Sequence, residues 1–350
     1  MATIKAPYQY SDNVIYGTTL NDTITGGYGN DTIYAVGGKN TIKAVSGSNL
    51  IYGSDGGDTI YGGTGSDVIR AGNGKDKIEL KSGHNYVFAG AGNDTITGGS
   101  GNDTIFGCSG SNKITAGGGS NFIYGGTGDD TIYGASRGND TIFGGSGNDQ
   151  ITTKGGNNVV FTGSGNNKVT SGSGGDTLVA GSGNNLLKGG SGGDQLWSGM
   201  GGNDTLQGGS HNDVLVGGTH GNNYLQGGLG SDHYVIDFSL NITDNPGTGV
   251  PGYVDSIGYN FIKDTGGASD VLELCGVDQS DVRYEQMGKY DLKISVVGVE
   301  GYIVIENHFK TANRIEEIKF VDANPYHLPI VNLGVIDADL TANPDPGFWG

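Results

Sequence analysis

A nine-residue repeat governs most of this 350-residue chain. In its clearest copy, residues 98–106, the unit reads GGSGNDTIF, with an aspartate at position six and an aliphatic residue at position eight. Counting in nines, with an extra residue at a few places, finds 25 copies between residues 13 and 234. Each copy has Asp or Asn at position six and an apolar residue or Tyr at position eight. So regular a period is typical of a solenoid.

The spacing within the unit predicts its conformation. Positions seven to nine form a short β-strand whose middle side chain points to the opposite face from its neighbours. Positions one to six form a turn, in which the abundant glycine (71 residues) supplies positive φ angles. Two units complete a coil of 18 residues, and coils stacked at ~4.8 Å form two parallel sheets about 60 Å long. The predicted fold is therefore all-β, with a thin core made of the position-eight side chains.

Charge is the main physical problem of such a fold. The formal net charge is −18, from 37 acidic and 19 basic residues, which disfavours nucleic acid or an anionic membrane as a partner. One aliphatic side chain per nine residues buries little apolar area, whereas ordering a glycine-rich backbone is costly. Stacking position-six aspartates also adds repulsion between neighbouring coils. We therefore expect cations between the stacked turns.

The unit G-G-x-G-x-(D/N)-x-(aliphatic)-x resembles the calcium-binding nonapeptide of the repeats-in-toxin (RTX, hemolysin-type) family. The resemblance covers about two thirds of the chain. It implies a right-handed parallel β-roll in which several calcium ions lie between turns, held by position-six carboxylates of successive coils and by backbone carbonyls. Ligands that are all oxygen suit calcium better than zinc or copper.

Position six supplies the predicted calcium ligands. Fifteen copies carry aspartate there: Asp22, Asp31, Asp58, Asp67, Asp76, Asp94, Asp103, Asp130, Asp140, Asp149, Asp176, Asp194, Asp204, Asp213 and Asp232. In six cases two aspartates are consecutive along the same turn edge, and these pairs are the strongest predicted sites: Asp58/Asp76, Asp76/Asp94, Asp130/Asp149, Asp176/Asp194, Asp194/Asp213 and Asp213/Asp232. Ten copies carry Asn, whose single neutral acceptor oxygen predicts weaker binding, with hydrogen bonds replacing the ion. The alternative is that Asp and Asn only close the turns.

Residues 235–350 lack the period, so we predict a repeat domain at 1–234 and a β-rich terminal region at 235–350. A Gly/Pro-rich connection is expected at 241–259, strands at 271–274, 282–286, 292–297, 302–306 and 315–321, and a loose tail from 338. The terminal region also resembles the one that caps the roll in the family. Residues 1–12 lead directly into the repeats and lack a signal peptide, leaving no room for a preceding catalytic domain. The family resemblance implies type I secretion through an uncleaved C-terminal signal.

Outward-facing position nine differs between the two predicted sheets. One sheet carries what we call the aromatic row: Tyr16, Tyr34, Tyr52, Arg70, Phe88, Phe106, Tyr124, Phe143, Phe161, Val179, Trp197, Val216 and Val235. Such a row either stabilises neighbouring strands or forms a contact surface, for a second copy among other partners. The opposite sheet is polar and rich in threonine, which leaves an ice-binding β-solenoid as an alternative. Lysines interrupt that array, and only Thr23/Thr25 and Thr95/Thr97 give a clean Thr-x-Thr.

Catalysis and disulfide chemistry find little support. The six histidines share no spacing that predicts a catalytic or metal triad: His84, His211, His220, His233, His308 and His327. We therefore predict that the chain is not an enzyme. Cys108 falls in a turn position usually held by glycine, and Cys275 lies far along the chain, so both are expected to be free thiols.

These observations favour a secreted calcium-binding protein that stays unfolded at cytosolic calcium and folds outside the cell. The folded rod is expected to serve as a structural, surface or interaction module. The alternative is a non-catalytic module of a secreted enzyme or toxin. No predicted segment spans a membrane.

Overall fold

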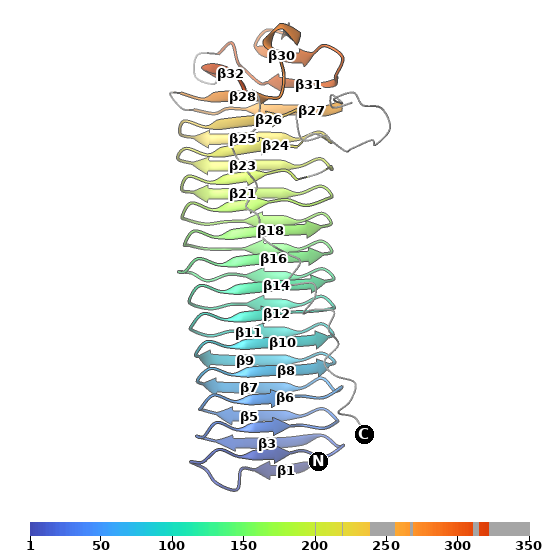
Figure 1. Cartoon of the computed structure of the whole chain (residues 1–350), viewed down its shortest axis with the longest axis vertical. Coiled ribbons are helices and arrows are strands. Elements are labelled where there is room, and N and C mark those ends of the chain that lie inside the picture. Colours follow the sequence, from blue (N-terminus) through green and yellow to red (C-terminus); the bar gives the residue numbers. More distant parts are fainter. Residues whose placement is uncertain (200, 219, 239–255, 267–268, 311–314, 322–350) are drawn as a thin grey trace.

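The computed structural model is a parallel β-solenoid whose coils stack into a rod, with antiparallel strands at one end (Figure 1). It describes residues 1–199, 201–218, 220–238, 256–266, 269–310 and 315–321. Within these residues there is no α-helix, only the 3-10 turn η1 (Gln279–Asp281). The all-β parallel roll predicted from the repeat is therefore confirmed.

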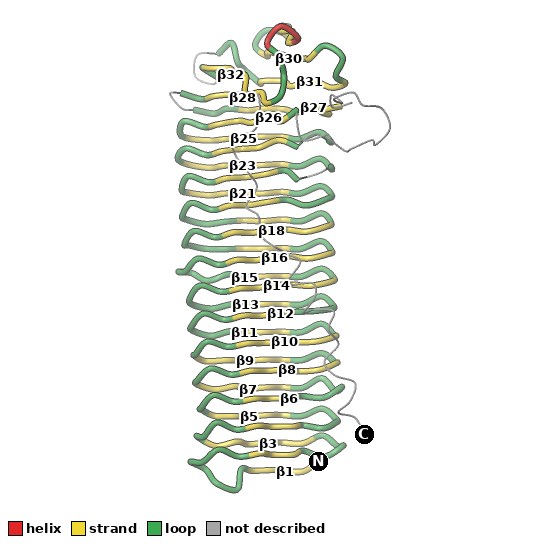
Figure 2. Tube along the Cα trace, in the orientation of Figure 1, coloured by secondary structure: helices red, strands yellow, loops and turns green. Residues whose placement is uncertain are grey.

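Two sheets run the length of the rod, and each coil contributes one strand to each sheet (Figure 2). The roll strands of sheet A are β1 (Ala2–Lys5), β3 (Asp22–Gly27), β5 (Thr41–Val45), β7 (Thr59–Thr64), β9 (Lys77–Ser82), β11 (Thr95–Thr97), β13 (Lys113–Thr115), β15 (Thr131–Tyr133), β17 (Gln150–Thr152), β19 (Lys168–Thr170), β21 (Leu186–Ser191), β23 (Thr205–Ser210) and β25 (Tyr224–Leu229). Those of sheet B are β2 (Val14–Tyr16), β4 (Thr32–Tyr34), β6 (Leu50–Tyr52), β8 (Val68–Asn73), β10 (Tyr86–Ala91), β12 (Thr104–Phe106), β14 (Phe122–Thr127), β16 (Thr141–Ser146), β18 (Val159–Ser164), β20 (Thr177–Val179), β22 (Gln195–Trp197), β24 (Val214–Gly217) and β26 (His233–Asp237).

The register of the parallel pairs confirms coils of 18 residues. Ile105 of β12 pairs with Val87 of β10 on one side and with Ile123 of β14 on the other. Where the repeat carries one extra residue the step becomes 19, as between Ile123 and Ile142. The extra residue is absorbed in a turn, so the core side chains stay aligned. Several strands are longer than the three residues predicted, because the first positions of the next unit continue the same pairing.

The core is the predicted column of position-eight side chains. From Ile24 to Leu225 these side chains are 0 % exposed, and Ile15 at the N-terminal end is 3 % exposed. Tyr234, the last position-eight side chain of the repeats, is also fully buried, and the equally buried Leu272 continues the column beyond it. Since each coil adds only two such side chains to the core, its stability also depends on the interactions in its turns.

The turns need residues with positive φ, and glycine usually supplies them. In the turn at residues 98–103, Gly99 has φ of 91° and Gly101 has φ of 119°. Cys108 occupies the slot equivalent to Gly99 and is forced to φ of 70°. Val36 and Val45 occupy the same slot in other turns, with φ of 72° and 75°. At these three positions the backbone adopts a left-handed conformation that is unfavourable for residues with a side chain.

Parallel pairing continues past the predicted domain boundary at residue 234. β27 (Ser256–Lys263) pairs with β25, and β28 (Val271–Cys275) pairs with β26. β31 (Glu300–Ile305) then pairs with β27, and β32 (Glu317–Val321) pairs with β28. The antiparallel strands β29 (Val282–Met287) and β30 (Asp291–Val296) complete the end of sheet A. We call the region from β27 to β32 the cap.

Five of the cap strands match the predicted ranges within two residues. β27 is a correction, because it begins at Ser256, inside the segment predicted as a connection. Pairing with β31, from Ser256 with Glu300 to Tyr259 with Tyr302, draws this stretch into sheet A despite its glycine. Most of the predicted connection and the predicted loose tail lie outside the described residues. Both cysteines are free thiols, as predicted.

Replacing Cys108 by glycine should relieve the strain of its positive φ. We expect Cys108→Gly to raise the free energy of unfolding by about 1 kcal/mol relative to Cys108→Ala, which keeps the strained Cβ. Urea unfolding in calcium-containing buffer, followed by circular dichroism, measures the difference. Equal or lower stability of the glycine variant would contradict this account of the turn.

Candidate metal site

The fifteen predicted aspartates lie in two rows, one along each turn edge of the roll. All are buried, with at most 2 % of the residue exposed. The row whose turns lead into sheet B contains Asp31, Asp67, Asp103, Asp140, Asp176, Asp194, Asp213 and Asp232. The row whose turns lead into sheet A contains Asp22, Asp58, Asp76, Asp94, Asp130, Asp149 and Asp204. Asparagines fill the remaining position-six places in both rows.

A ladder of hydrogen bonds fixes the orientation of each aspartate. One carboxylate oxygen, Oδ1, accepts a bond from the backbone N–H of the position-six residue in the preceding coil. The six predicted Asp/Asp pairs are all joined in this way, with N–O distances of 2.6 Å (Asp58/Asp76), 2.7 Å (Asp76/Asp94), 2.9 Å (Asp130/Asp149), 2.8 Å (Asp176/Asp194), 2.8 Å (Asp194/Asp213) and 3.0 Å (Asp213/Asp232). The remaining predicted aspartates are flanked by asparagine or, for Asp22, by the N-terminal strand.

Asparagine at position six reduces the repulsion between stacked turns by donating a hydrogen bond to the next carboxylate. The Asn85 side-chain amide donates to Asp103 Oδ1 at 2.8 Å and to the Gly83 carbonyl at 3.2 Å. The same amide-to-carboxylate bond joins Asn13/Asp31, Asn40/Asp58, Asn49/Asp67, Asn121/Asp140, Asn158/Asp176 and Asn185/Asp204. A consecutive Asp pair lacks this donor, so its two carboxylates need positive charge from elsewhere.

The second carboxylate oxygen, Oδ2, distinguishes the sites further. In some turns a neighbouring group satisfies it, as Ser54 does for Asp58 through its N–H (2.9 Å) and its hydroxyl (3.1 Å). In nine of the predicted aspartates Oδ2 is buried and has no hydrogen-bond partner: Asp67, Asp76, Asp94, Asp103, Asp130, Asp149, Asp194, Asp213 and Asp232. Leaving a buried polar oxygen without a hydrogen-bond partner costs about 1–3 kcal/mol, and a charged oxygen costs more. Buried carboxylate oxygens without a partner, repeated from coil to coil, are candidate ligands for a cation.

Comparison with family models identifies the repeat. The model described as the RTX calcium-binding nonapeptide repeat (4 copies) matches residues 10–42, 43–78, 52–87, 79–112, 109–136, 135–169, 170–201, 198–219 and 218–235. The chain belongs to the RTX family. A second model, the haemolysin-type calcium binding protein related domain, matches residues 291–323 of the cap.

Other comparisons add little to the family assignment. No curated protein matches the chain. Among solved structures, the chain is similar to the X-ray crystal structure of a hyperactive, Ca²⁺-dependent, β-helical antifreeze protein from an Antarctic bacterium, with 15 % identity and a TM-score of 0.28. That match covers 91 % of this chain and 96 % of the other. At that TM-score the superposition carries no argument about this RTX protein.

The buried aspartates of the RTX repeats have raised pKa values. Burial, together with repulsion from the carboxylates of Asp232 and Asp194, raises the pKa of Asp213 to about 8. Burial also raises the pKa of Asp76 to about 7, with added repulsion from Asp94 and Asp58. The ionised forms of these groups are therefore unfavourable in the metal-free roll at neutral pH.

The donor set fits calcium, which the RTX repeats bind. Each consecutive Asp pair presents buried carboxylate oxygens, and the turn backbone beside it is rich in carbonyls. Such a set contains no nitrogen or sulfur ligand, which disfavours zinc and copper. When bound, calcium supplies the positive charge that lets neighbouring carboxylates ionise together.

The ladder continues one coil beyond the last matched repeat. Asp232 N–H donates to Asp270 Oδ1 at 2.6 Å, so Asp270 takes the position-six place in the first coil of the cap. Counting in nines misses Asp270, because 38 residues separate it from Asp232. The signal that could have found it is the triplet Asp270-Val271-Leu272, which has the aspartate and the core side chain at repeat spacing.

The aromatic row lies on sheet B as predicted, with stacked rings. Tyr34 and Tyr52 have ring centroids 4.9 Å apart and nearly parallel planes. Exposure falls along the row, from 63 % at Tyr16 to 3 % at Phe143 and 4 % at Trp197. Around Trp197 the row joins a second hydrophobic cluster that includes Cys275 of the cap. Among the aromatic side chains of the row, Tyr16 is the exposed one, and Phe106, Phe143 and Trp197 are buried, whereas the others are half-buried.

Sheet A presents a polar outer face that is not a regular threonine array. The exposed side chains of Lys43 and Lys77 stand on it between threonine pairs. Lys43 lies over the ring of Tyr61, 5.9 Å from its centroid. This irregular, charged face does not favour the ice-binding alternative.

Stability of the metal-free chain should fall as pH rises. The pKa values of Asp76, Asp194 and Asp213 are about 7 to 8 in the folded state, against 3.8 for an ordinary aspartate. Between these limits the folded state binds more protons than the unfolded state, so its stability is greatest near and below about pH 4 and is lost through about pH 7 to 8. Circular dichroism in metal-depleted buffer should show β-structure at low pH that disappears as the pH is raised.

Added calcium should remove that loss, because it neutralises the ionised carboxylates. Asp213→Asn should flatten the profile between about pH 6 and 8, since it deletes the group with the highest of these pKa values. A metal-free chain that gains β-structure as the pH rises from about 4 to 8 would contradict this prediction.

Proposed function

We propose that this RTX protein is secreted and that its roll folds when the chain meets extracellular calcium. The folded rod then acts as a non-catalytic structural, surface or interaction module. The observation that supports this most is the set of consecutive Asp pairs whose Oδ2 atoms are buried without a partner. Such pairs favour the folded state only where a cation neutralises them.

The switch follows from what the chain's own residues do. Without a cation, the carboxylates of Asp194, Asp213 and Asp232 repel across neighbouring coils, and each coil adds little apolar burial in return. The unfolded chain separates these charges. Calcium that binds the folded state alone stabilises it by mass action. The Asn/Asp pairs between these sites hold the coils in register through amide bonds to Oδ1, which lower their need for an ion.

The location follows from the affinity expected of such sites. Extracellular calcium modules bind at roughly 10⁻⁴ to 10⁻³ M, far above cytosolic calcium. A chain with this affinity stays unfolded inside the cell, in a form that a type I exporter can pass. The C-terminal segment expected to carry the export signal lies outside the described residues. In the described part of the chain no helix is long and apolar enough to cross a membrane.

A non-catalytic role is supported by the chemistry of the described side chains. Among the described residues, the one group of three or more His, Cys, Asp or Glu placed to hold a metal ion consists of aspartates alone. His84 and His211 lie on exposed turns, and His233 pairs with Glu273 at 2.8 Å. His211 Nδ1 lies 3.3 Å from the hydroxyl of Ser210, but this contact joins adjacent residues on an exposed turn.

Calcium titration tests the proposal. In chelator at neutral pH the chain should give the circular dichroism of a coil, and millimolar calcium should convert it to β-sheet. Magnesium should substitute poorly, because it requires short octahedral bonds and dehydrates reluctantly. The double variant Asp194→Asn/Asp213→Asn should move the calcium midpoint upward by about tenfold, since three consecutive pairs lose charge.

Asp55→Asn is the matched control for that variant. Asp55 is exposed and accepts a bond from the Asn73 side chain at 2.8 Å, which the amide oxygen of asparagine can also accept. It should leave the midpoint unchanged. Folding that is equally complete in chelator and in calcium would refute the proposed switch.

Self-association through the aromatic row remains a prediction. The N-terminal end of the row supports it best, where Tyr16 is exposed and stacks on Tyr34, which in turn stacks on Tyr52. Sedimentation velocity in calcium should show dimers of the wild-type chain that Tyr16→Ser/Tyr34→Ser reduces. A strict monomer would remove self-association and leave the calcium switch untouched.

A further inference from the structure

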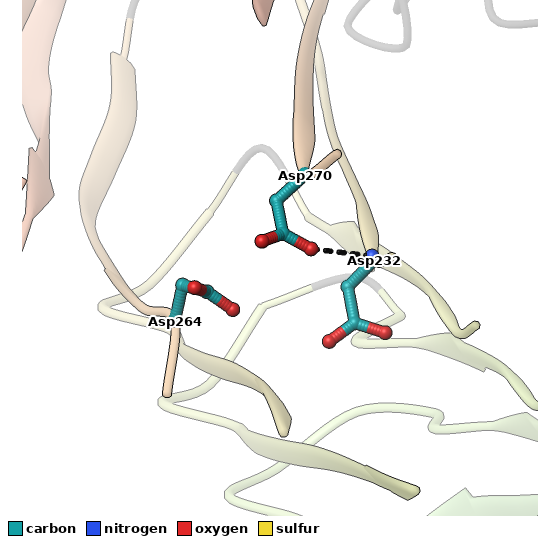
Figure 3. Close-up of side chains that lie close together, drawn as sticks. All are labelled: Asp232, Asp264 and Asp270. Atoms are coloured by element: carbon teal, nitrogen blue, oxygen red, sulfur yellow. Dashed lines mark hydrogen bonds between the residues drawn. The ribbon is translucent and has the colours of Figure 1, made fainter. Parts of the chain in front are cut away.

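Three buried aspartates meet where the last repeat joins the cap. One carboxylate oxygen each from Asp232, Asp264 and Asp270 lies within 4.8 Å of the other two (Figure 3). All three residues are at most 1 % exposed. Asp264 and Asp270 fall between the segments that the two family models match, so the repeat pattern assigns neither of them.

The three side chains come from three separate segments. Asp232 immediately precedes β26, Asp264 immediately follows β27, and Asp270 immediately precedes β28. Lys263 pairs with Gln226, which places Asp264 in register with Gly227, the first glycine of the preceding turn. In the roll this place is held by small residues such as Gly98, Ala71 or Ser171. A third carboxylate at this place therefore has no counterpart in the repeats.

Unpartnered oxygens point into this cluster. Asp264 Oδ1, Asp232 Oδ2 and Asp270 Oδ2 are buried and accept no hydrogen bond. The bond from Asp232 N–H to Asp270 Oδ1 holds two of the carboxylates side by side. None of the ion pairs among the described residues involves the three aspartates. Three buried carboxylates without a basic partner repel one another, and a bound cation would offset that repulsion.

We propose that Asp232, Asp264 and Asp270 form a divalent cation site that fastens the cap to the roll, and that its ion is calcium. Opposite ligands of calcium, bound at about 2.3–2.6 Å, are about 5 Å apart, which suits oxygens within 4.8 Å of one another. Magnesium, bound at about 2.0–2.1 Å, would require a tighter cluster. The site shares its chemistry with the proposed function but depends on two residues outside the repeats.

The position of the site explains what an ion there does. β27 carries β31 on its free edge, and β28 carries β32. Asp270 is also tied to the start of β32, since its N–H donates to Glu316 Oε2 at 2.8 Å and its carbonyl accepts from Glu316 N–H at 2.9 Å. One ion therefore links the last repeat to both strands on which the cap is built. A closed cap protects the end of both sheets from pairing with other chains.

Hydrogen exchange across a calcium titration of the full chain tests the site, because it reports the cap and the roll separately. Peptides covering β27 and β28 report the cap, and peptides covering β14 to β18 report the middle of the roll. Asp264→Ser places a serine where the equivalent turn of the roll has Ser171, whose hydroxyl donates to Asp176 of its own turn. The coil of the variant can therefore still close. Asp264→Asn keeps the shape of the side chain and removes only its charge.

The calcium concentration at the midpoint of cap protection should be lowest for wild type, higher for Asp264→Asn and highest for Asp264→Ser. The last should lie about tenfold above wild type, because one of three anionic ligands is lost. The midpoint in the middle of the roll should stay the same in both variants. The control Asp55→Asn should shift neither region.

Two outcomes overturn the proposed site: a cap midpoint in Asp264→Asn and Asp264→Ser equal to wild type, or an equal shift in cap and roll. The test also separates this site from the proposed function. Suppose that calcium leaves the hydrogen exchange of the roll unchanged but protects the cap, and that Asp264→Ser abolishes this cap protection. The proposed switch then fails and the junction site stands. If the roll responds and the cap variants behave as wild type, the junction site alone fails.

Discussion

Repulsion between buried carboxylates is the constraint on which this structure depends. Each turn places an aspartate or asparagine directly above the equivalent residue of the preceding coil, and a backbone N–H fixes one oxygen of each. The geometry that stacks the coils therefore also stacks the charges. Asparagine relieves the repulsion with a side-chain amide, whereas consecutive aspartates lack that donor. In the proposed switch, the order of Asp and Asn along each edge therefore sets where folding depends on metal.

The rest of the repeat serves this arrangement. Glycines at the positive-φ positions let the turn close tightly enough for the ladder bonds to form, and the position-eight column sets the register that aligns the carboxylates. Insertions such as the one between Ile123 and Ile142 are tolerated because the turn absorbs the extra residue while both the core and the ladder keep their partners. So thin a core supplies little apolar burial per coil, which is consistent with the proposed calcium-dependent fold.

The sequence was sufficient for the roll because each structural role recurs 25 times. Any single Asp103 or Ile105 is weak evidence, but a fixed interval between an acidic and an aliphatic residue determines the coil length, the core and the six Asp pairs. The interval fails at the end of the roll, where 38 residues separate Asp232 from Asp270 although they occupy successive rungs. Asp264 could not be found by pattern at all, since the repeats use small residues there. Which Oδ2 atoms are satisfied also depends on individual turn residues, such as Ser54 or Ser171, that no period encodes.

The most direct test of the central claim is a crystal structure of the chain grown in ample calcium, with anomalous diffraction used to locate the ions. The account predicts calcium peaks beside Asp76, Asp194 and Asp213, about 2.3–2.6 Å from carboxylate oxygens of successive coils. It also predicts weaker peaks, or none, at Asn/Asp pairs such as Asn85/Asp103, where an amide already bonds the carboxylate. A well-ordered roll with no ion beside those three aspartates would contradict the account.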